Sequence, residues 1–317
     1  MKKANKFLEE IVSKRKHMKI IEVKGNTFCI DTGNEYIPFY KVNDKEIILL
    51  DSGLKTERER IGKLVNDNDF IVKAIICSHA HIDHIGNCSY FKEKYNSIIA
   101  MPAYEALLCS SVVNLKVYYS SQTLAEVKEN FGHMVCDTDI MIFNNQSHIE
   151  VFGLKFNIVH TSGHSPGHIC IITPDDVMYL GDTLLSSEIM KAAKLPFAQI
   201  ISEDLKSKIK LKELKHNKYI VAHKGVYTDI ANLIEDNIKQ YDVVANSIFR
   251  LIDDGMTMDN IKTAVIIAFN IKINSKYRYH LIERLLKPYI EYLSEIGRVE
   301  TKIQDGELIY SKVICSE

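Results

Sequence analysis

The chain has 317 residues, a length that suits about two domains on a prior of roughly 100–200 residues each. Hydrophobic residues make up 46% and charged residues 26%, an ordinary globular mixture that excludes an intrinsically disordered chain. Lys and Arg number 40 against 41 Asp and Glu, for a net charge of -1, so a surface that binds polyanions throughout is not expected.

Residues 1–21 are charged throughout and lack the apolar core of a signal peptide. No later run reaches the roughly 18 apolar residues of a membrane span. Cysteines are odd in number, dispersed and without a CxxC pair: Cys29, Cys77, Cys88, Cys109, Cys136, Cys170 and Cys315. We therefore expect a cytoplasmic protein with reduced thiols and no membrane partner.

In the first two-thirds of the chain, short β-rich runs alternate with helical stretches. The pattern predicts strands over 28–33, 36–42, 46–53, 70–77 and 96–102, and helices over 55–66, 86–95 and 102–133. Strands return between residues 148 and 182, followed by a helix over 203–215 and a strand in KYIVAHKG, residues 218–225. This mixture predicts sheets covered by helices.

The pattern changes after about residue 230. Apolar residues at helical spacing predict one long helix over 229–254 and shorter helices over 257–270 and 275–296. Residues 298–313 read as a hairpin that turns at Gln304–Gly306. Three helices and a hairpin are the element order of a winged-helix domain. We therefore expect a catalytic domain over 1–228 and a winged-helix-like domain over 229–317.

The segment SHAHIDHIG places His79, His81, Asp83 and His84 within six residues, directly after an apolar strand. In extended backbone His79 and His81 point the same way, whereas the following turn offers Asp83 and His84 in another direction. One segment could thus serve two metal ions.

Three further candidates, His164, Asp182 and His223, each follow a short apolar run, so all could converge on one edge of the sheets. Five imidazoles and two carboxylates suit zinc, with iron or manganese as alternatives.

The motifs HAHIDH, TSGHSPGH, LGD and VAHKG resemble, in order and spacing, the metallo-β-lactamase superfamily over residues 20–228. The resemblance implies an α+β fold, a four-layer αβ/βα sandwich, with the site at one edge of the paired sheets. It assigns the first metal to His79, His81 and His164, the second to Asp83, His84 and His223, and a bridging position to Asp182. It also implies that Asp51 supports the ligands through hydrogen bonds, and it places His168 behind them.

This resemblance implies two divalent cations roughly 3.5–4 Å apart that share a water and lower its pKa towards about 7. The bridging hydroxide would attack the substrate. Asp83 and Asp182 would be the catalytic carboxylates, and Asp83 would also accept a proton from the water.

Two segments, 104–122 and 184–200, are expected to shape the substrate pocket, with Tyr118, Tyr119, Met190 and Phe197 as lining residues. Their apolar character favours a small ester, thioester or lactone. Equally, these residues could simply pack as a helical lid.

Two alternatives stay open. The terminal winged helix resembles that of β-lactamase-like endoribonucleases that act on single-stranded RNA, and Lys272, Lys276, Arg278 and Arg284 cluster in it. However, residues 243–317 hold ten basic and ten acidic residues, which leaves nucleic acid open without favouring it; the region could instead form a homodimer contact. The other alternative is a non-hydrolytic iron-dependent oxidoreductase of the same fold.

Overall fold

A computed structural model describes residues 18–313, so the charged segment 1–17 and Cys315 lie outside the described residues. The chain divides into two units. Among the described residues, the first comprises 18–160, 167–182 and 215–230, and the second comprises 161–166, 183–214 and 231–313. The six cysteines of the described part are buried free thiols, as predicted. Among the described helices, none has the length and apolar character needed to cross a bilayer.

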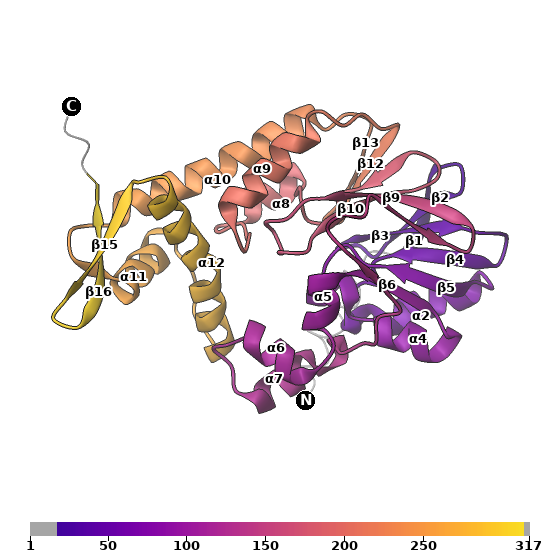
Figure 1. The fold of residues 1–317 in the computed structure, drawn as a ribbon, viewed down its shortest axis with the longest axis horizontal. Coiled ribbons are helices and arrows are strands. Elements are labelled where there is room, and N and C mark those ends of the chain that lie inside the picture. Colours follow the sequence, from indigo (N-terminus) through magenta and orange to yellow (C-terminus); the bar gives the residue numbers. More distant parts are fainter. Residues whose placement is uncertain (1–17, 314–317) are drawn as a thin grey trace, which may run out of the picture. The chain divides into compact units, whose positions relative to one another are not determined.

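The first unit contains two sheets (Figure 1). The first sheet has seven strands in chain order: β1 (Lys19–Lys24), β2 (Thr27–Asp31), β3 (Tyr36–Lys41), β4 (Glu46–Leu50), β5 (Ile71–Ile76), β6 (Ile98–Pro102) and β7 (Ile140–Ile142). Strands β1 to β4 pair antiparallel, whereas β4 to β7 pair parallel.

The second sheet has six strands in the order β13-β12-β11-β10-β9-β8. Its strands are β8 (His148–Val151), β9 (Leu154–His160), β10 (Ile169–Ile172), β11 (Val177–Tyr179), β12 (Lys218–Val221) and β13 (Gly225–Tyr227). Only β11 and β12 pair parallel in this sheet.

Strand β4 shows why the sequence runs of this unit are continuously apolar. Ile47 and Leu49 belong to a core shared with helices, while Ile48 and Leu50 belong to a core shared with strands of the second sheet. Successive side chains of a strand point to opposite faces, so both faces of β4 are covered. The helices that contribute to the first core are α2 (Arg58–Asp67), α3 (Ile82–Ile85), α4 (Cys88–Tyr95) and those of the 102–133 region. The short η1 (Lys55–Glu57) precedes α2.

The helical region predicted over 102–133 is three helices and a short turn rather than one run. These are α5 (Ala103–Leu108), α6 (Val112–Tyr118), α7 (Leu124–Phe131) and η2 (Gly132–Met134). The Ser111 and Thr123 side chains accept hydrogen bonds from backbone N–H groups three residues on, and so begin α6 and α7. Such caps satisfy N–H groups that a helix leaves unpaired, which explains breaks without glycine or proline.

The second unit is mainly helical. It contains α8 (Ser187–Ala192), α9 (Ile201–Leu211), α10 (Ala231–Leu251), α11 (Met258–Ala268) and α12 (Lys276–Glu295). Strands β14 (Met256–Thr257), β15 (Val299–Gln304) and β16 (Glu307–Lys312) form a small sheet in the order β14-β16-β15. The predicted helices and hairpin of this region are confirmed. One core joins Leu195 and Ile201 to Tyr241, Leu286 and Tyr289, so the 184–211 segment folds with the C-terminal helices.

Candidate metal centre

Parallel strand pairs bring the candidate ligands of the first unit together. Asp51 follows β4 and His79 follows β5, and the Asp51 N–H donates to the Ile76 carbonyl at 3.0 Å. Asp182 follows β11 and His223 follows β12 in the same way. Because parallel neighbours end at the same edge of a sheet, residues distant in sequence meet there. The Tyr36 N–H of β3 donates to the Ala222 carbonyl at 2.7 Å, which joins the two sheets at this edge.

One group of candidate ligands consists of Asp83, His84, Asp182 and His223, whose ligand atoms lie within 4.8 Å of one another. The Nε2 atom of His223 is 3.3 Å from Asp83 Oδ2 and 3.3 Å from Asp182 Oδ1. The Nε2 atom of His84 is 3.4 Å from the same Asp182 oxygen and 3.8 Å from Asp83 Oδ2. Two carboxylates and two imidazoles thus face one point.

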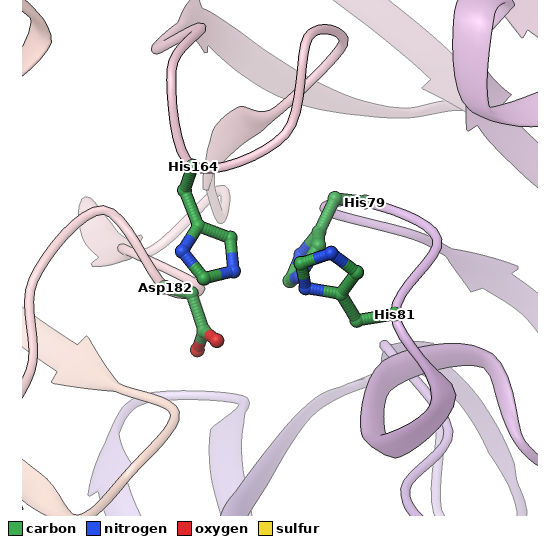
Figure 2. A group of neighbouring side chains, drawn as sticks. All are labelled: His79, His81, His164 and Asp182. Carbon is green, nitrogen blue, oxygen red and sulfur yellow. The ribbon is translucent and has the colours of Figure 1, made fainter. Parts of the chain in front are cut away.

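Another group consists of His79, His81, His164 and Asp182, again with ligand atoms within 4.8 Å (Figure 2). The Nε2 atom of His79 lies 2.8 Å from Nδ1 of His81. Asp182 belongs to both groups. All seven ligands predicted from the motifs are therefore brought into these two groups.

The charges of the cluster call for a cation. The Asp182 carboxylate raises the pKa of the His223 imidazole to about 10. Burial lowers the pKa of His84, but the carboxylates of Asp182, Asp83 and Asp51 outweigh it and raise that pKa above its ordinary value. Burial raises the pKa of Asp83, yet His84 and His223 hold it below the usual range. A divalent ion can supply the positive charge that protons would otherwise supply.

His84 shows that the residues fit a metal. Its Nδ1 lies 2.7 Å from Asp51 Oδ2, and a carboxylate accepts, so Nδ1 carries the proton. Its Nε2 is buried and has no hydrogen-bond partner among the described residues. A buried imidazole nitrogen with a lone pair and no donor is a typical metal ligand.

Asp51 is the hub behind this ligand. It is 2% exposed, and its Oδ1 accepts from the Ser78 N–H at 2.6 Å. Its Oδ2 accepts from the Ser78 hydroxyl at 2.6 Å and the Tyr179 hydroxyl at 2.6 Å, in addition to His84. These contacts hold the start of the HAHIDH segment and the His84 tautomer in place, as expected for a residue that supports metal ligands.

His168 contacts two candidate ligands, since its ring lies against that of His79, with centroids 4.9 Å apart, and its side chain meets the backbone of Asp182. Its Nε2 accepts from the Asp182 N–H at 3.1 Å. Gly181 has a φ of +50°, and a Cβ there would lie 2.6 Å from His168 Nε2. The LGD motif therefore needs glycine because the imidazole approaches the backbone closely.

Sequence reasoning missed Glu105. This side chain is fully buried, and its two oxygens accept from the Ala80 N–H at 3.1 Å and the Gly167 N–H at 3.0 Å. It therefore ties the HAHIDH segment to the GHSPGH segment. Glu105 is a single glutamate in an ordinary helical run, so nothing in its local sequence indicates this role.

The predicted pocket residues have different surroundings. The Tyr118 hydroxyl lies 3.1 Å from His81 Nε2. Tyr119 is 9% exposed and stacks on Phe131 with ring centroids 3.8 Å apart, so it lies in the core rather than beside the histidines. Met190 is buried in the core of the second unit, and the Phe197 ring contacts His164.

The chain is similar to known proteins of one family. The sequence profile of the Metallo-beta-lactamase superfamily matches residues 39–223. A hydroxyacylglutathione hydrolase of Haemophilus influenzae is 28% identical over 194 residues, which cover 59% of this chain and 84% of that protein. A hydroxyacylglutathione hydrolase of Prochlorococcus marinus is 21% identical over 244 residues, which cover 76% of this chain and 85% of that protein.

Solved structures share the fold. A metallo-beta-lactamase family protein from Thermus thermophilus matches 94% of this chain and 99% of its own, with a TM-score of 0.65 and 16% identity. A beta-lactamase domain protein from Burkholderia ambifaria matches 93% and 94%, with a TM-score of 0.66 and 15% identity. The profile covers more than half of the chain. The chain therefore belongs to the metallo-beta-lactamase superfamily, with its α+β fold, and is a metal-dependent hydrolase.

Proposed function

We propose that the protein is a dinuclear hydrolase of small acyl compounds, a thioester in the first place and otherwise an ester or lactone. The observation that supports two ions is that Asp182 belongs to both ligand groups. His79, His81 and His164 would hold the first ion, and Asp83, His84 and His223 would hold the second. Zinc suits these imidazole and carboxylate ligands, with iron or manganese as the alternatives.

Divalent cations held there would lower the pKa of a water molecule and polarise the substrate carbonyl. The protein's own side chains would position that water molecule and accept its proton. Asp83 and His223 have side chains 24% and 23% exposed, whereas His84 is 2% exposed, so substrate approaches from the side of Asp83 and His223. Asp83 is ionised at neutral pH because its pKa is lowered, which suits a metal ligand. A lowered pKa also makes it a weaker base, so its proposed role as proton acceptor rests on its place beside His223 at the more exposed side of the cluster.

A thioester substrate is supported by the relatives, because two of them are named hydroxyacylglutathione hydrolases. Tyr118 adds a phenol beside His81, where it can contact the acyl or thiol part of a small substrate.

We further propose that residues 229–317 form a winged-helix-like domain that follows a catalytic domain over 1–228. The order α10, α11, α12 and the β15–β16 hairpin supports it. Two members of its basic cluster already have partners, one in this domain and one in the 184–200 segment. The Arg278 Nε donates to the Lys272 carbonyl at 2.9 Å, and the Arg284 guanidinium lies 5.0 Å from the Phe197 ring centroid. This use of Arg278 and Arg284 disfavours an RNA surface.

A substrate panel tests the proposed function. Zinc-loaded protein is offered acyl thioesters, aryl esters, lactones, a bis-aryl phosphodiester and a short single-stranded RNA. We expect turnover of acyl thioesters, reduced at least about 10²-fold in Asp83→Asn because that variant loses a ligand and a proton acceptor. Asp67→Asn is the matched control, since Asp67 pairs with Lys63 and its side chain is 56% exposed. Cleavage of RNA alone, or equal turnover in the two variants, would contradict the proposal.

A further inference from the structure

Phe197 contacts the candidate ligand His164 in two ways. The His164 Nδ1 lies 3.1 Å from the Phe197 carbonyl oxygen. A carbonyl only accepts, so Nδ1 carries the proton and Nε2 keeps its lone pair for a cation. The Phe197 ring also meets the imidazole edge to face, with centroids 5.5 Å apart and an interplanar angle of 85°. The position of Phe197 therefore sets both the tautomer and the orientation of His164.

Two C-terminal helices, α10 and α12, hold Phe197 in turn. The Tyr241 hydroxyl of α10 donates to the same Phe197 carbonyl at 2.8 Å. The Arg284 guanidinium of α12 lies over the Phe197 ring. The Tyr289 hydroxyl, also of α12, donates to the neighbouring Pro196 carbonyl at 2.8 Å. Both tyrosines are buried, at 2% and 0% exposure, so water does not readily replace these donors.

The same face of α10 holds a second segment next to a candidate ligand. Asn237 lies one turn before Tyr241 and is buried. Its Oδ1 accepts from the Leu185 N–H at 2.9 Å, and its Nδ2 donates to the Leu185 carbonyl at 2.9 Å. Leu185 comes three residues after Asp182 in the chain. Residues four apart share a helix face. One face of α10 therefore holds the segment after Asp182, through Asn237, and the Phe197 carbonyl beside His164, through Tyr241.

We propose that Tyr241 is a positioning residue for the metal centre, acting on His164 through the Phe197 carbonyl, with Arg284 holding the Phe197 ring. This inference rests on the proposed function, because it assigns His164 to the first ion. When one nitrogen of an imidazole binds a metal, the carbonyl that accepts the N–H of the other nitrogen strongly influences the metal affinity. Tyr241 fixes where that carbonyl points. The C-terminal helices thus belong to the support of the centre, and Arg284 serves this support rather than a nucleic-acid surface.

Zinc affinity tests the inference without using turnover. The full-length chain is stripped of metal and titrated with zinc against a chromophoric chelator, and then with cobalt while its visible absorption is recorded. Tyr241→Phe is compared with Tyr289→Phe, a matched control that loses an equally buried hydroxyl bond to the adjacent carbonyl, which His164 does not use. We expect the affinity for the zinc ion at His164 to fall about tenfold in Tyr241→Phe, with an altered cobalt spectrum. In Tyr289→Phe the same affinity should change less than about threefold.

The outcomes separate the two proposals. Equal zinc affinities and equal cobalt spectra in Tyr241→Phe and Tyr289→Phe would overturn the positioning role, since both would then act only on stability. Absence of zinc binding by the unaltered chain would instead overturn the proposed dinuclear centre. If Tyr241→Phe does not fold, Arg284→Gln takes its place. It should weaken zinc binding relative to Lys287→Gln, an exposed control on the same helix whose lysine pairs with Glu291, and equal affinities would again overturn the inference.

Discussion

Asp51 shows how one buried carboxylate positions candidate metal ligands without being a ligand itself. Its Oδ2 faces three donors, from Ser78, His84 and Tyr179. Its backbone has a φ of +66°, a conformation that Asp tolerates better than most residues. The carboxylate therefore fixes the proton of His84 on Nδ1 and leaves Nε2 for a cation.

Asp51→Asn should damage both stability and metal binding. An amide NH2 at the Oδ2 position meets three donors, so we expect the free energy of unfolding of metal-free protein to fall by about 2–3 kcal/mol. The amide would also favour the other His84 tautomer, with Nε2 protonated, and zinc affinity should fall at least about tenfold. Urea unfolding and chelator competition measure the two effects. Asp67→Asn, at an exposed ion pair, should change stability by less than about 0.5 kcal/mol, and equal effects in both variants would contradict this role.

Sequence signals pointed to the candidate metal ligands and to Asp51 and His168 behind them, but not to the more distant supports. His79, His81, Asp83 and His84 stand together in the sequence, so their chemistry is visible without a structure. Glu105 and Tyr179 act from distant segments, and each is an ordinary residue of a helix or strand until the fold places it. Tyr119 was assigned to the pocket with Tyr118, yet α6 ends at Tyr118, and the Tyr119 ring packs on Phe131.

At the scale of elements, helix α9 and the 161–166 loop fit closely within the second unit. The Ile200 and Gln199 N–H groups donate to the Gly163 and His164 carbonyls at 2.9 and 3.2 Å. The Ser207 hydroxyl donates to the Ser162 carbonyl at 2.7 Å. Gly163 has a φ of +134°, and a Cβ there would lie 2.1 Å from the Asp204 backbone nitrogen. The loop that carries His164 therefore has no room for a side chain at position 163.

Gly163→Ala should displace this loop. We expect a loss of stability well beyond the about 1–2 kcal/mol that a left-handed backbone alone costs an alanine, together with weaker zinc binding. Gly153→Ala is the control, because Gly153 has a φ of +73° and nothing lies within 4 Å of its added Cβ. Thermal unfolding and zinc competition compare the two. A Gly163→Ala protein as stable as Gly153→Ala, with unaltered zinc affinity, would contradict the close fit.

Element types were predictable where the hydrophobic pattern is clear, as a continuous apolar run in β4 and β5 and as helical periodicity in α10 and α12. The 102–133 region was predicted as one helical stretch because it lacks glycine until Gly132. Caps at Ser111 and Thr123 divide it, and a capping residue looks like any other polar residue in sequence. Short strands such as β7 and β13 have three residues each, too few for a clear alternation.

At the scale of the whole molecule, family membership defines the reaction class more firmly than the substrate, because one fold supports different reactions. In this chain Tyr241 and Arg284 of the C-terminal helices contact Phe197, whose carbonyl oxygen lies 3.1 Å from His164 Nδ1. The element order of that region was predictable from the sequence. Its contacts with Phe197 were not, since they join residues 44 and 87 positions apart.

We propose that two adjacent cation sites share Asp182 and together drive acyl hydrolysis. The most direct test is the turnover of an acyl thioester as zinc is titrated into metal-free protein. We expect negligible turnover without metal and a rise that saturates at about two zinc equivalents per chain, with Asp182→Asn inactive at every concentration. Turnover that is independent of added metal, or that Asp182→Asn retains, would contradict it.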